Sequence, residues 1–66
     1  MKAVTVRKIV KDNNLNLVVK GRTNGIVEVA LTENINDVNT LNELLNGFGF
    51  ELAKRFNMYN VVPVRK

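Results

Sequence analysis

The 66-residue chain is 45% apolar with a formal net charge of +4, and it contains no cysteine, histidine, serine, tryptophan or glutamine. This length allows one domain at most, and no stretch resembles a membrane span or a signal peptide, so we expect a single cytoplasmic domain over residues 1–66. Without imidazole, thiol or serine hydroxyl groups, we expect neither an enzyme, nor a transition-metal site, nor a bound cofactor.

The first predicted strand covers residues 3–10, AVTVRKIV, which are rich in β-branched side chains. Val6, Ile9 and Val10 also fit the spacing of one helical face. A short helix over residues 5–12 is therefore the alternative to the strand.

Two more strands are predicted at residues 15–20 and 26–33, because apolar and polar side chains alternate along both. Their shared apolar face consists of Leu15, Leu17, Val19, Val27, Val29 and Leu31. A two-residue turn at Asn24-Gly25 mixes the two faces, whereas placing Val19 opposite Val27 keeps them apart and leaves a loop at residues 21–25. The three strands then form an antiparallel meander with one buried face.

A long helix is expected over residues 39–57, where Thr40 and Glu43 match a capping box. Its apolar stripe consists of Val38, Leu41, Leu45, Phe48, Leu52, Phe56 and Tyr59. In a continuous helix Phe50 lies off this stripe among small residues, which makes it a candidate for protein contact. The pair Asn46-Gly47 is also a helix stop, and in that alternative Phe50 joins the core.

The C-terminal residues 60–66 predict a last strand at the edge of the sheet, because Pro63 has no N–H to donate. The expected fold is α+β with the order β-β-β-α-β. It consists of a three-stranded antiparallel meander packed against one long helix, with a C-terminal edge strand.

Charges fall into three blocks, because residues 1–25 and 54–66 are basic and residues 26–53 are acidic. One face of the predicted sheet points away from the helix. Basic residues on this face, and in the loops that join the strands, are candidates for nucleic-acid contact. These candidates are Arg7, Lys11, Lys20 and Arg22. A purely solvated face is the alternative reading of the same residues.

Val18 and Ile26 are predicted to be exposed on the same face, and exposed apolar side chains are typical of protein contact. Together with Phe50 they are the candidate protein-contact residues. We therefore predict a small, non-enzymatic protein-interaction or regulatory module whose partner is another protein or a second copy in a homodimer. A nucleic-acid-binding accessory protein is the alternative, and we expect no membrane or small-molecule partner.

Overall fold

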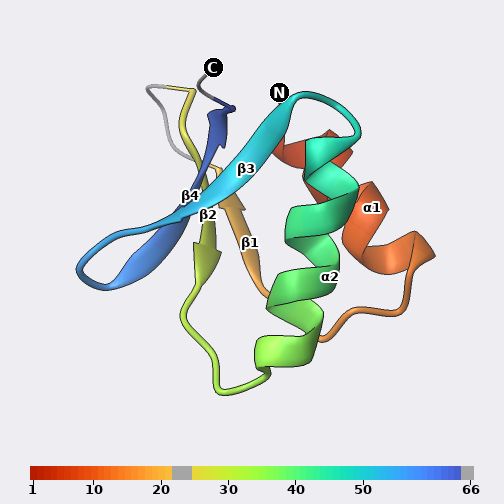
Figure 1. Cartoon of the computed structure of the whole chain (residues 1–66), viewed down its shortest axis with the longest axis vertical. Helices are drawn as coiled ribbons and strands as arrows, with labels where there is room; N and C mark the ends of the chain where they lie inside the picture. The colour runs from red at the N-terminus through yellow and green to blue at the C-terminus, as the bar shows by residue number, and fades with distance from the viewer. Residues whose placement is uncertain (22–24, 65–66) are drawn as a thin grey trace.

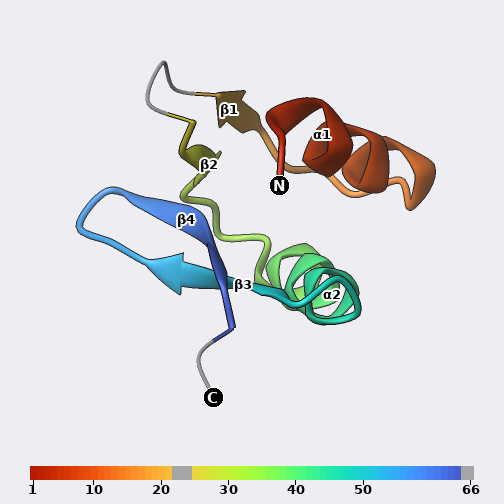
Figure 2. The same ribbon diagram turned by 90° about the horizontal axis from the view of Figure 1, so that it is seen from above.

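The computed structural model describes residues 1–21 and 25–64. Its elements are α1 (Ala3–Asp12), β1 (Val19–Gly21), β2 (Val27–Ala30), α2 (Ile35–Asn46), β3 (Phe50–Lys54) and β4 (Met58–Pro63). The strands form one antiparallel sheet in the order β1-β2-β4-β3, and both helices cover the same side of it (Figure 1; Figure 2). The α+β class is confirmed, but the expected β-β-β-α-β order and three-stranded meander are wrong.

The core lies between the sheet and the two helices. Its buried apolar residues are Val6, Val10, Val27, Val29, Val38, Leu41, Leu45 and Tyr59. Full burial of a valine or leucine side chain stabilises a fold by about 1.5–3 kcal/mol. Each buried valine and leucine of this core therefore contributes on that order to the stability of the fold.

Residues 3–12 form a helix, so the predicted first strand is wrong and the helical alternative is close to the observed bounds. Val6 and Val10 lie one helical turn apart and are both buried, and the half-buried Ile9 packs against the same core. A β-branched residue loses only a few tenths of a kcal/mol in a helix relative to alanine. Burial of the two valines outweighs this propensity cost.

The alternation along β1 and β2 predicted the inward faces correctly. Val27 and Val29 are buried, and Val19 is half-buried against the core. Val19 lies opposite Val29 rather than Val27, so the predicted register is wrong by two residues. A shift of two leaves every side chain on its own face, because the period of a strand is two. Leu31, expected on the apolar face, lies beyond β2 and is exposed.

The expected helix over residues 39–57 is wrong at both ends, since α2 begins at Ile35 and ends at Asn46. Thr40 is not in a capping box but lies within the helix, where its Oγ1 donates to the Asn36 carbonyl at 2.9 Å. The first part of the predicted stripe is confirmed as core. Its buried residues are Val38, Leu41 and Leu45.

A turn at residues 47–49 separates α2 from β3, so the helix-stop alternative is correct. Gly49 has a φ of +84°, a left-handed conformation that side chains other than glycine rarely adopt. Phe50 therefore starts β3 instead of standing on a helix, and it is half-buried against the core. Its predicted position on an exposed helix surface is wrong.

The strand that contains Pro63 lies inside the sheet, between β2 and β3, so its predicted edge position is wrong. Pro63 is tolerated because the pairing of β2 with β4 ends at Val61, and beyond it Pro63 faces only Phe50 of β3. The true edge on this side is β3, a strand that the sequence assigned to the helix.

Candidate interaction surface

One side of the sheet is left uncovered by both helices and by every other described element (Figure 2). We call it the outer face. Side chains reach it from the strand positions that alternate with the core-facing ones. Its residues are Val18, Lys20, Ile26, Glu28, Ala30, Glu51, Ala53, Met58, Asn60 and Val62.

The middle of the outer face is built by β2 and β4, whose side chains form rows of matched polarity. Glu28 lies opposite Asn60, and Ala30 lies opposite Met58. One step further along the same register, Ile26 is level with Val62. A polar row is thus flanked by an apolar row on each side.

The polar row lies unusually deep for an uncovered face. Glu28 is only 8% exposed, and Lys20 of β1 lies directly across from it. The Oδ1 atom of Asn60 is buried and accepts no hydrogen bond from any described residue. An unsatisfied buried acceptor of this kind costs about 1–3 kcal/mol, so the centre of the outer face is not optimised for the isolated chain.

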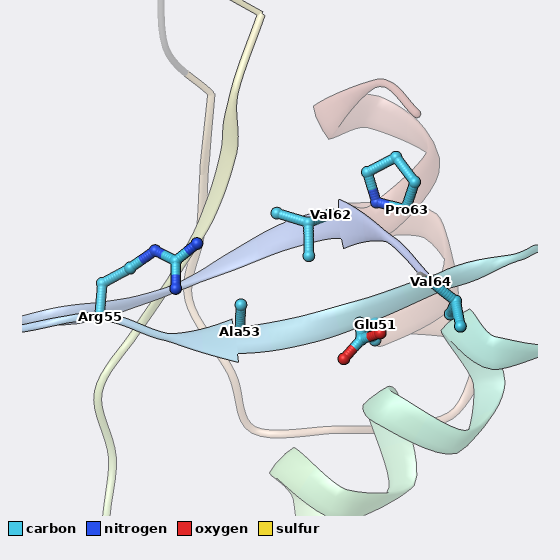
Figure 3. Close-up of a pocket in the computed structure, with 6 residues that line it drawn as sticks. All are labelled: Glu51, Ala53, Arg55, Val62, Pro63 and Val64. Atoms are coloured by element: carbon cyan, nitrogen blue, oxygen red, sulfur yellow. The ribbon is translucent and has the colours of Figure 1, made fainter. Parts of the chain in front are cut away.

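A shallow, open hollow lies at the β3–β4 end of the outer face, with Arg55 at one end and Val64 at the other (Figure 3). It is lined by Glu51, Ala53, Arg55, Val62, Pro63 and Val64. Among the described residues that line it, Glu51 and Arg55 are the charged ones. Within residues 1–21 and 25–64, no group of three or more histidine, cysteine, aspartate or glutamate side chains is arranged to hold a metal ion.

Two of the three predicted protein-contact residues lie on this surface, at opposite ends of the β1–β2 pair. Val18 and Ile26 are both exposed on the outer face, at the β1 and β2 side of it. Phe50 lies on β3 with its side chain against the core. Strand alternation found the first two correctly, whereas the position of Phe50 depended on a helix that does not extend so far.

The structure does not assemble the predicted nucleic-acid-contact set. Arg7 and Lys11 lie on α1, on the opposite side of the sheet from Lys20, because residues 3–12 are a helix and not a strand. The Nη2 atom of Arg7 donates to the Val19 carbonyl at 3.3 Å. Arg22, the fourth candidate, lies outside the described residues. Of the three described candidates, Lys20 alone projects from the outer face as expected.

Sequence reasoning missed the tip of the β3–β4 hairpin, which projects away from the rest of the molecule (Figure 1; Figure 2). Here the Arg55 N–H donates to the Met58 carbonyl at 2.7 Å and closes a turn made by Phe56 and Asn57. Phe56, expected in the apolar stripe of the helix, is 101% exposed. A signal was present, since the string KRFN, in which three of the four residues are polar or charged, separates two alternating segments.

Comparisons of this chain with family models, with curated proteins and with solved structures found no match. No helix formed by the described residues is long and apolar enough to cross a membrane.

Proposed function

We propose that this chain is a protein-interaction module that associates with a second copy of itself through the outer face. The observation that carries the proposal is the uncovered middle of the sheet, where apolar side chains flank a polar row. Mixed charge argues against a phosphate-binding face, because Glu28 lies directly opposite Lys20 and Glu51 adds a second carboxylate on the edge strand β3. Both carboxylates would repel a polyanion. A protein surface of mixed polarity fits this composition better.

The outer face of a second copy is complementary to this one. Along both β2 and β4, the outward side chains are apolar, polar and apolar in turn, and the two strands are antiparallel. A two-fold axis parallel to the strands, midway between β2 and β4, exchanges these strands between the copies. Ile26 then faces Val62 of the second copy, and Ala30 faces Met58 of the second copy, so apolar rows meet apolar rows. Aligned sheets cross at about 30°, so the match is best near the axis, where these residues lie.

The size of the molecule sets the expected strength of this contact. One face of the molecule is small, because its Cα extents are only 26 × 24 × 21 Å, whereas a standard interface buries roughly 800 Å² per partner. We therefore expect a weak dimer that dissociates on dilution.

Light scattering or sedimentation over a hundredfold range of concentration tests the proposal. The 7.4 kDa chain should approach twice that mass at the upper end of the range. Ile26→Asp, at a 40% exposed position on the outer face, should abolish the rise in mass. Ile35→Asp is the matched control, because Ile35 is 51% exposed at the start of α2, where an aspartate is tolerated.

Two outcomes would overturn the proposal. One is a wild-type mass that stays at the monomer value throughout the range. The other is an equal loss of association in Ile26→Asp and Ile35→Asp, which would move the contact away from the outer face. Circular dichroism of both variants checks that the fold is retained.

A further inference from the structure

We propose that the tip of the β3–β4 hairpin binds single-stranded nucleic acid, with Phe56 stacked on a base and Lys54 and Arg55 contacting phosphates beside it. This goes beyond self-association, because the tip lies outside the matched rows of β2 and β4. A dimer through the outer face and a hairpin that binds nucleic acid are compatible in one protein. The two proposals also fail independently.

Nothing in the fold accounts for a phenylalanine at position 56. Its side chain is fully exposed and takes no part in the core. Two-residue hairpin turns favour asparagine or glycine with positive φ, yet positive φ among the described residues occurs only at Asn14, Gly25 and Gly49. Neither burial nor turn geometry therefore explains this aromatic residue.

The charged residues that adjoin Phe56 in the sequence are both basic. Lys54 and Arg55 precede it and are both exposed, and successive residues of a strand point to opposite sides. The two cations therefore flank the tip from both sides of the hairpin. Glu51 is the last acidic residue of the chain, so no carboxylate follows it in the sequence.

Single-stranded nucleic acid offers the two chemistries that this tip can recognise. An unpaired base presents a flat π-surface on which an aromatic side chain stacks, and the neighbouring phosphates attract lysine and arginine. A duplex hides its base faces in the stack and offers only the phosphates. The tip therefore predicts a preference for single strands with little dependence on base sequence.

Stacking is tested directly by Phe56→Trp, because the chain has no tryptophan and the variant carries one indole at the tip. We expect an oligothymidylate of about 12 nucleotides to quench this fluorescence. Phe48→Trp is the matched control, since Phe48 is also exposed, at 60%, in the turn after α2. Quenching should be absent there, and equal quenching in both variants would overturn the proposal.

Anisotropy of the labelled oligonucleotide, measured from about 50 to 200 mM salt, separates the aromatic contribution from the charges. Phe56→Ala should weaken binding about fivefold to a hundredfold without changing the salt dependence. Lys54→Ala and Arg55→Ala should each reduce the slope of log K against log salt by about 0.7. All three residues are exposed, so thermal unfolding should change little.

Three results would overturn the inference. Phe56→Ala could bind the oligonucleotide as tightly as the wild type does. A duplex of the same sequence could bind as tightly as the single strand. Vesicles containing phosphatidylserine could shift the emission of Phe56→Trp while the oligonucleotide does not, which would assign the tip to a lipid surface.

Discussion

Asn42 of α2 caps the edge strand β3, because its Oδ1 atom accepts a hydrogen bond from the backbone N–H of Leu52 at 2.8 Å. The backbone N–H of Leu52 points away from β4, because every second residue of β3 hydrogen-bonds to β4 and Leu52 lies between two of them. Contacts such as Arg55 with Met58 and Gly49 with Val64 show this pattern. An unpaired N–H on an edge strand invites pairing with another chain, and a helix side chain occupies it here.

Replacing Asn42 by alanine should therefore destabilise the fold and expose the edge. We expect the free energy of unfolding to fall by about 1–2 kcal/mol, because a half-buried N–H loses its acceptor. Asn39→Ala is the control, since Asn39 is exposed on the same helix and gains the same helix propensity. Urea unfolding compares the two variants, and equal midpoints would contradict the predicted role of Asn42.

Asp37 connects the chain before β1 to the start of α2. Its Oδ2 atom accepts from the Asn16 N–H at 2.8 Å and from the Asn34 Nδ2 at 2.7 Å. Asp37→Ala should reduce stability by about 2–3 kcal/mol, because hydrogen bonds to a charged group are stronger than neutral ones. Hydrogen exchange at the Asn16 amide should speed up in this variant. Glu43→Ala, at an exposed position of α2, should leave that exchange rate unchanged.

Gly49 is the residue that lets the chain turn from α2 into β3. A Cβ atom at this position would meet nothing within 4 Å, so the cost of a side chain comes from its φ of +84°. Gly49→Ala should destabilise the protein by about 1–2 kcal/mol. Gly49→Asn should cost less, because asparagine tolerates the left-handed region. Thermal unfolding measures both, and an equal loss in the two variants would refute this explanation.

Asn60 is expected to limit the stability of the isolated chain. Its buried Oδ1 finds no donor among the described residues, and replacing such a group by an apolar one of similar size is neutral or stabilising. Asn60→Val should raise the free energy of unfolding by about 1 kcal/mol, because valine also favours a strand. If urea unfolding shows Asn60→Val to be less stable than the wild type, Asn60 makes a stabilising hydrogen bond and the prediction is wrong.

Where the apolar residues of a segment fit either the helix period or the strand period, but not both, the sequence predicted correctly which side chains are buried. The alternation of Leu15, Leu17 and Val19 predicted which side chains turn inward, and all three pack against the core. Likewise, Val38, Leu41 and Leu45 of α2 were predicted as buried helix residues. These predictions hold because burial of one face is a property of each segment, whichever partner covers it.

Two segments carried apolar spacings that do not by themselves decide between helix and strand. Val6 and Val10 lie four residues apart, which suits one face of a helix and also one face of a strand. Leu45, Leu52 and Tyr59 recur every seven residues, which equals two helical turns, although Leu52 and Tyr59 reach the core from β3 and β4. In both places the ambiguity could be resolved only by contacts with the rest of the molecule.

The predicted interaction residues show the same difference between local patterns and contacts that depend on the whole fold. Val18 and Ile26 were placed correctly because alternation within one strand suffices to turn them outward. Arg7 and Lys20 were expected on one face but lie on opposite sides of the sheet, because their grouping required the correct element for residues 3–12. Phe56 was expected in the core and stands fully exposed at a hairpin tip.

By itself, the sequence determined the α+β class, the inward faces of β1, β2 and α2, and the outward direction of Val18 and Ile26. Only the tertiary structure decided that β4 lies between β2 and β3, that β3 forms the edge, and that Phe56 projects from the tip. Strand order depends on contacts between residues far apart in the chain, such as Val27 with Val61. Local periodicity carries no information about such contacts, because it reports which side of a segment is buried and not what buries it.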